Sequence, residues 1–168
     1  MTVLILAKAF GCTVIVTSSS DAKLALVQSK YGADHTINYK TTPLWGRAAA
    51  ALTRDGAGVD VVIENGGSET IAQSFEAVKM GGLIAVIGFL SAAKQEEMPD
   101  VASLVLAKGA IVRGITVGSK QFLEELVQFM TERDLKVPVD RVFKFDEVEE
   151  AFEYLKSGSH VGKVCIEI

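Results

Sequence analysis

The chain has 168 residues, 49% hydrophobic and 23% charged, with a net charge of −4. This length and composition predict a folded domain of ordinary size rather than a disordered segment. Because the net charge is negative and no basic run occurs, we expect no binding to nucleic acid or to an anionic membrane surface. The two cysteines, Cys12 and Cys165, are too few for a disulfide framework or a cysteine-rich zinc site.

The first ten residues are apolar but do not have the pattern of a signal peptide. They lack its basic flank and its small-residue cleavage site. No stretch of the chain approaches the ~18 consecutive apolar residues of a membrane-spanning helix. We therefore expect a cytoplasmic protein with no membrane contact.

Residues 2–10 allow two interpretations. Val3, Leu6, Ala7 and Phe10 would share one face of a helix that Gly11 ends, whereas residues 2–6 alone could equally form a strand. Further along, β-branched runs predict strands, and apolar residues at helical spacing predict helices. The predicted strands comprise residues 13–17, 35–39, 59–63, 83–87, 110–117, 138–145 and 162–168. The predicted helices comprise residues 22–31, 45–53, 68–80, 101–108, 119–133 and 146–156.

Local signals mark the ends of two of these helices. Ser68 is the predicted N-cap of the helix over residues 68–80, and two glycines at 81–82 are predicted to end it. Asp146, with Glu149 three residues later, predicts an N-cap with a capping box for the last helix.

The strand–helix–strand unit over residues 59–90 gives the fold class. Its two strands are mostly apolar and rich in β-branched residues, which is typical of strands buried on both faces of a parallel sheet with right-handed crossovers. The regular alternation of strands and helices along the chain predicts an α/β protein with a Rossmann-like, doubly wound, mostly parallel sheet.

Sheets of this kind bind ligands beyond the carboxyl ends of their strands. Small, polar or glycine-rich segments lie at the carboxyl ends of five of the predicted strands, at Ser18–Ser20, Tyr39, Glu64–Gly67, Gly88–Leu90 and Val117–Ser119. The same residue types are common in ordinary turns, so their spacing alone does not identify a site. The two histidines, His35 and His160, are interpreted as structural or solvent-exposed, and we expect neither catalytic residues nor metal ligands in this chain.

Segments 13–46, 58–91, 112–119 and 139–163 resemble, in the same order, the medium-chain alcohol dehydrogenases and quinone reductases. The resemblance covers nearly the whole chain. It implies that residues 1–137 form a Rossmann-like nucleotide-binding domain, incomplete at its start. It also implies that residues 138–168 form a C-terminal segment that packs on a catalytic domain in this family. A nicotinamide dinucleotide is the cofactor that the resemblance implies.

The resemblance also implies a role for each strand end. Ser18, Ser19, Ser20 and Lys23 would contact the adenosine ribose, Tyr39 would flank the adenine, and Lys163 would lie near the phosphates. The nicotinamide end would be lined by Asn65, Gly66, Gly67, Gly88, Phe89, Leu90, Val117 and Gly118. Members that prefer NAD usually have an acidic residue where this chain has three serines, and Asp21 comes later. Because hydroxyls and a cation suit a 2′-phosphate, NADP is predicted over NAD.

The chain begins within the helix that, in the family, follows the first strand and the glycine-rich turn. That turn holds the pyrophosphate, and no G-x-G-x-x-G pattern precedes Gly11. The family's catalytic domain, with its zinc ligands and proton relay, also has no counterpart here. We therefore expect a truncated protein that holds NADP weakly if at all, binds no zinc and transfers no hydride alone.

The first strand lies at the centre of the family's sheet, so its absence leaves the strands over 13–17 and 59–63 without a shared neighbour. Residues 2–6 could replace it, those two strands could pair directly, or a second chain could supply contacts. The family's dimers join through the strand matching residues 111–117, which predicts a homodimer. A different reading is a naturally short family member that serves as a non-redox enzyme or as a binding or dimerisation module. The missing pyrophosphate turn favours this reading, whereas the retained cofactor-facing loops favour the oxidoreductase.

Overall fold

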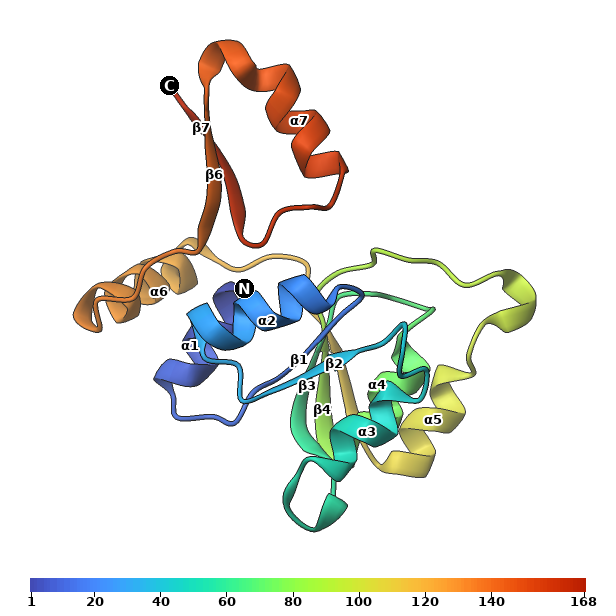
Figure 1. Ribbon diagram of the computed structural model, residues 1–168. Helices are drawn as coiled ribbons and strands as arrows, with labels where there is room; N and C mark the ends of the chain where they lie inside the picture. The colour runs from blue at the N-terminus through green and yellow to red at the C-terminus, as the bar shows by residue number, and fades with distance from the viewer.

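The strands form three separate sheets (Figure 1). The structure is a computed structural model that describes residues 1–168. The strands are β1 (Ile15–Ser18), β2 (His35–Asn38), β3 (Val59–Glu64), β4 (Val78–Val86), β5 (Ile111–Gly114), β6 (Val139–Lys144) and β7 (Lys163–Glu167). The helices are α1 (Thr2–Ala9), α2 (Asp21–Tyr31), α3 (Trp45–Ala51), α4 (Ile71–Ala77), α5 (Val101–Lys108), α6 (Lys120–Glu132) and α7 (Val148–Lys156). Single 3₁₀ turns lie at Arg54–Gly56, Gln95–Glu97 and Phe145–Glu147.

All paired strands are parallel, which confirms the predicted α/β class. β1 pairs only with β2, and β6 pairs only with β7. β4 lies between β3 and β5 in the third sheet. Because the strands of each sheet run in the same direction, their carboxyl ends meet at one edge.

β1 and β3 are not hydrogen-bonded to each other, and these two strands have no shared neighbour in the sheet. Two of the three ways proposed to fill this gap are wrong. Residues 2–6 belong to helix α1, which buries Leu4 against Val27 and Ala33, and the two flanking strands do not pair directly. Contacts from a second chain, and the absence of a first strand with its glycine-rich turn, stay predictions.

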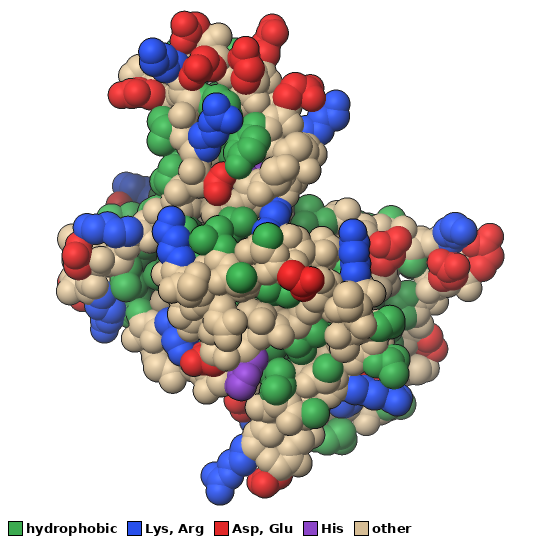
Figure 2. All heavy atoms as spheres, in the orientation of Figure 1, with side chains coloured by type: hydrophobic (Ala, Val, Ile, Leu, Met, Phe, Trp, Pro, Cys, Tyr) green, Lys and Arg blue, Asp and Glu red, His purple; other side chains and the backbone are tan.

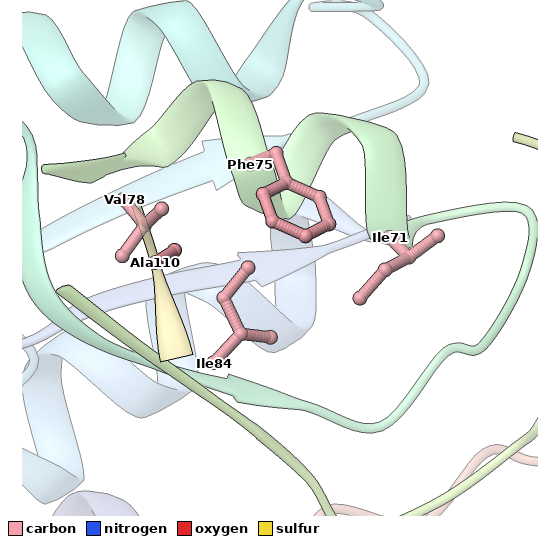
Figure 3. Close-up of a cluster of buried hydrophobic side chains, with 5 residues drawn as sticks. All are labelled: Ile71, Phe75, Val78, Ile84 and Ala110. Carbon is pink, nitrogen blue, oxygen red and sulfur yellow. The ribbon is translucent and has the colours of Figure 1, made fainter. Parts of the chain in front are cut away.

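One apolar cluster holds the three-stranded sheet against its helices (Figure 3). Ile71 and Phe75 come from α4, Val78 and Ile84 from β4, and Ala110 precedes β5. Phe75 is 1% exposed. Burying a side chain of this size stabilises the fold by about 1.5–3 kcal/mol relative to leaving it in water. This core fixes the positions at which β3, β4 and β5 end.

The helix predicted over residues 68–80 is shorter than expected. α4 begins after Thr70, and the Ser68 hydroxyl accepts a hydrogen bond from the Ala93 N–H at 2.7 Å instead of capping the helix. The chain becomes strand β4 at Val78, which is fully buried and pairs with Val59. The two glycines at 81–82 therefore lie inside strand β4, in the irregular stretch between Val78 and Leu83 where its pairing with β3 shifts register.

Two further predicted boundaries are also wrong. β5 ends at Gly114, so the strand predicted to reach Val117 is shorter. Asp146 does not cap the last helix, because it lies in the 3₁₀ turn that precedes α7. The carboxylate of Glu147 accepts a hydrogen bond from the Lys144 N–H at 2.8 Å and so fixes this turn.

β6, α7 and β7 form a C-terminal unit that projects from the rest of the molecule (Figure 1). Figure 2 shows acidic side chains gathered on the outer end of this unit and hydrophobic side chains near its base. Packing of residues 138–168 on a catalytic domain stays a prediction. No helix of the structure has both the length and the apolar character needed to cross a bilayer.

Candidate cofactor-binding site

The carboxyl ends of β1 and β2 bring the predicted adenosine-side residues together. The Tyr39 N–H donates to the Ser18 carbonyl at 3.1 Å, which joins the two strand ends. The Ser20 hydroxyl accepts from the Lys23 N–H at 3.4 Å and caps α2. Ser19 lies between these two serines, so all five residues lie at the same sheet edge.

Asp21, the acidic residue that follows the three serines, has a hydrogen-bond partner that the sequence analysis did not predict. Asn38, the last residue of β2, donates from its side-chain amide to the Asp21 carboxylate at 2.7 Å. Asp21 stands in the first turn of α2, after the three serines. The only sequence signal for this hydrogen bond is an asparagine at the end of a short strand. Asparagine is also common in turns, so the signal is weak.

A cavity of about 360 Å³ lies between this edge and the C-terminal unit. Its lining includes Ser18, Lys23 and Lys163, together with His160 and Val161. Lys163 opens β7 and is far from Lys23 in the sequence. The fold therefore brings two predicted phosphate-binding cations to one hollow, where hydroxyl and ammonium groups suit an anion.

Lys23 also contacts the C-terminal unit directly. Its ammonium donates to the carbonyl oxygen of Gly158 and to that of His160, the latter at 3.2 Å. The imidazole Nδ1 of His160 is buried without a hydrogen-bond partner. An ammonium has three donors, so Lys23 retains one for a ligand in the cavity.

Asp140 fixes the loop that forms one wall of this cavity. Its carboxylate accepts from the Tyr154 hydroxyl at 2.6 Å and from the Val161 N–H at 3.1 Å. The Tyr154 hydrogen bond, reinforced by the Val161 amide, lowers the pKa of Asp140 below its usual 3.8. The same hydrogen bond raises the pKa of Tyr154 above its usual 10.0.

A second group of predicted residues surrounds the buried carboxylate of Glu64, the last residue of β3. Glu64 is 4% exposed. One carboxylate oxygen accepts from the Gly66 N–H at 2.7 Å, the Gly67 N–H at 3.1 Å and the Thr70 hydroxyl at 2.7 Å. The other accepts from the Ser74 hydroxyl. The sequence analysis predicted a binding site at the end of this strand but assigned no role to the Glu64 carboxylate, which accepts these hydrogen bonds.

The loops after β3 and β4 are joined by backbone hydrogen bonds. The Leu90 N–H donates to the Asn65 carbonyl at 3.2 Å, and the Ser91 N–H donates to the Gly66 carbonyl at 2.7 Å. Gly88 packs so closely on the Asn65 side chain that a Cβ there would overlap it. The structure therefore brings residues 65–67 and 88–90 together.

Some of the predicted residues have exposed side chains, and one lines a different hollow. Phe89, Leu90 and Val117 are exposed. Gly118 precedes α6 and lines a different hollow, beside Phe122 and Leu126. The structure does not bring Gly118 into the cavity that contains Lys23.

The chain brings together no three His, Cys, Asp or Glu side chains that could hold a metal ion. A zinc ion needs about three or four such ligands around one point. The residues of this chain therefore do not fit a zinc ion, and we derive no chemistry through one.

Comparison with known proteins identifies what the chain is similar to. It is 42% identical over 165 residues to a zinc-type alcohol dehydrogenase-like protein of Schizosaccharomyces pombe, covering 96% of this chain and 46% of that protein. It is 33% identical to a probable quinone oxidoreductase of Leishmania amazonensis, covering 95% of this chain and 50% of that protein. The chain thus spans about half the length of these curated relatives.

The fold agrees with these relatives. A crystal structure of an NAD-dependent alcohol dehydrogenase superposes on 98% of this chain and 46% of its own, with a TM-score of 0.85 and 31% identity. This agreement confirms the Rossmann-like class and the resemblance to alcohol dehydrogenases and quinone reductases. The family model for zinc-binding dehydrogenases matches residues 1–132. The chain therefore belongs to the zinc-binding dehydrogenase family.

Proposed function

We propose that this chain is the cofactor-binding part of an oxidoreductase of the alcohol dehydrogenase and quinone reductase type, and that its cofactor is NADP. The observation that carries the proposal is the cavity lined by Ser18, Lys23 and Lys163. Two cations and a hydroxyl around one hollow are the groups that bind phosphate oxygens.

The choice of NADP over NAD rests on charge. Ser18 ends β1, the hydroxyls of Ser19 and Ser20 follow it, and Lys23 lies in the first turns of α2. Asn38 binds the Asp21 carboxylate at 2.7 Å and so gives that acid a partner within the protein. The neighbour named as NAD-dependent shares the fold, but its name says nothing of these side chains.

The nicotinamide end of the cofactor is assigned to the two joined loops that contain Asn65–Gly67 and Gly88–Leu90. Ligands of parallel sheets bind beyond such strand ends. The cofactor supplies hydride chemistry when bound, and this chain's residues would hold and orient it. We propose that hydride transfer needs substrate-binding residues outside this chain, because the relatives are about twice as long.

A homodimer through β5 is also proposed. β5 is an edge strand, and Ile111 on it is 61% exposed, so its outer edge is free to pair with a second copy. The cytoplasmic location stays a prediction from composition.

Titration with NADPH and NADH tests the cofactor assignment. Thermal shift and nicotinamide fluorescence should show saturable binding, with NADPH bound more tightly than NADH. If neither cofactor binds up to millimolar concentration, the dinucleotide proposal for this chain is wrong.

A further inference from the structure

We propose that Glu64 is a positioning residue for the nicotinamide end of the cofactor. It acts by holding the loop Asn65–Gly67 and, through that loop, Gly88–Leu90. This inference rests on the proposed function, because it assigns those loops to the nicotinamide end.

Glu64 accepts hydrogen bonds on both oxygens of its carboxylate. Two of its partners, the Gly66 and Gly67 N–H groups, can only donate, and they share one oxygen with the Thr70 hydroxyl. The Ser74 hydroxyl donates to the other oxygen. A carboxylate is the side chain that accepts on both oxygens and donates on neither. Its burial adds weight to each contact, because unpaired buried polar groups are costly.

The loop that Glu64 holds is packed against and hydrogen-bonded to Ser91. Gly67 has a φ of +104°, and a Cβ there would overlap the Ser91 carbonyl. The Gly66 carbonyl accepts from both the Ser91 N–H at 2.7 Å and the Ser91 hydroxyl at 3.0 Å. A change at the Glu64 carboxylate would therefore move both loops together.

The adenosine side does not depend on this carboxylate. The contacts among Ser18, Ser20, Lys23 and Tyr39 involve no atom of Glu64 or its loop. Glu64 should consequently affect one end of the dinucleotide and leave the other end unchanged. A residue that only stabilises the fold would not separate the two ends.

The test is Glu64→Gln in the full chain, titrated with NADPH and with 2′,5′-ADP, which contains only the adenosine end. Because an amide has one acceptor oxygen where the carboxylate has two, the donors on one side lose their acceptor, and NADPH affinity should fall about five- to tenfold. Affinity for 2′,5′-ADP should stay unchanged. Glu69→Gln is the matched control, since Glu69 is exposed in the same segment, and it should bind both ligands like the unsubstituted chain.

A second variant and a second measurement keep the inference testable if Glu64→Gln does not fold. Thr70→Val removes one donor to Glu64 at nearly constant shape, and it should weaken NADPH in the same selective way. Amide hydrogen exchange of Gly66 and Gly67 should also accelerate in the variants.

The inference is overturned if NADPH affinity is unchanged, if both ligands weaken equally, or if the exchange of Gly66 and Gly67 is unaffected. The unsubstituted chain reports separately on the proposed function. If it does not bind NADPH, the proposed function fails, and the role of Glu64 in it fails with it. If it binds NADPH and the variants do so equally well, only the inference about Glu64 fails.

Discussion

The ring of Phe10, at the end of α1, stacks on the ring of Phe129 in α6, with centroids 4.6 Å apart and planes inclined by 19°. The Arg133 guanidinium lies 4.0 Å from the centroid of the Phe129 ring. Met130 is the one buried residue of α6, and the stacked rings are a direct contact between this helix and the end of α1. Figure 1 shows the two helices side by side although they come from distant parts of the chain.

Phe129→Ala should lower the free energy of unfolding by about 1–2 kcal/mol, because it removes the stacked pair and part of the apolar contact. Phe122→Ala is the control on the same helix. Its ring is 63% exposed, and its removal should cost less than about 0.5 kcal/mol. Urea unfolding followed by circular dichroism measures both values. Equal losses for the two variants would contradict a specific role for the Phe10–Phe129 stack.

Lys23→Ala should abolish discrimination by the 2′-phosphate. Comparing 2′,5′-ADP (adenosine 2′,5′-bisphosphate) with 5′-AMP by calorimetry isolates this group, since the two ligands differ only there. We expect the unsubstituted chain to bind 2′,5′-ADP about tenfold more tightly, as one charge-assisted contact provides, and the variant to bind the two alike. Lys30→Ala, on the exposed part of the same helix, should leave the ratio unchanged. A ratio that survives Lys23→Ala would assign the 2′-phosphate to another residue.

Stability should fall in acid partly through Asp140. Its pKa in the folded chain is lowered below 3.8 by the Tyr154 hydroxyl and the Val161 amide. A depressed carboxyl pKa contributes stability above the unfolded value, and this contribution disappears as pH falls through the folded value. Asp140→Asn should therefore lower the free energy of unfolding at neutral pH and weaken its decline below about pH 4.

Some acid sensitivity should remain in that variant, because the pKa values of Asp34, Asp60 and Asp100 are also lowered. Asp146→Asn is the control, since Asp146 is an exposed residue of the same unit. Thermal unfolding across pH measures both. If Asp140→Asn and the unsubstituted chain show parallel curves, the Tyr154 contact does not stabilise the fold.

Ile111→Glu should convert the proposed dimer into a monomer. The substitution places two like charges across paired β5 edges, where a strand partner would exclude water. Leu106→Glu is the control. It introduces the same charge on α5, away from that edge, at a side chain that is 84% exposed, and it should leave the dimer intact. Sedimentation velocity gives the mass of each. A monomeric unsubstituted chain at every concentration would refute the β5 interface.

The sequence by itself determined the order and type of nearly all elements. α5 lies where it was predicted, around residues 101–108, from apolar residues such as Leu104 and Leu106. The parallel sheet was predicted from mostly apolar runs such as residues 59–63. This pattern can be recognised without knowledge of the rest of the fold. These features are local, so each is readable from a few neighbouring residues.

Only the tertiary structure decided features that depend on distant partners. Val78 belongs to a strand rather than a helix because it is buried opposite Val59, and no local signal reports that pairing. The separation of the sheets depends on which strand edges meet. Lys23 and Lys163 share one cavity because the C-terminal unit folds back over α2, and Glu64 organises its loop because burial leaves its carboxylate no water to bind. Such relationships follow from chain topology and burial, which a sequence pattern does not contain.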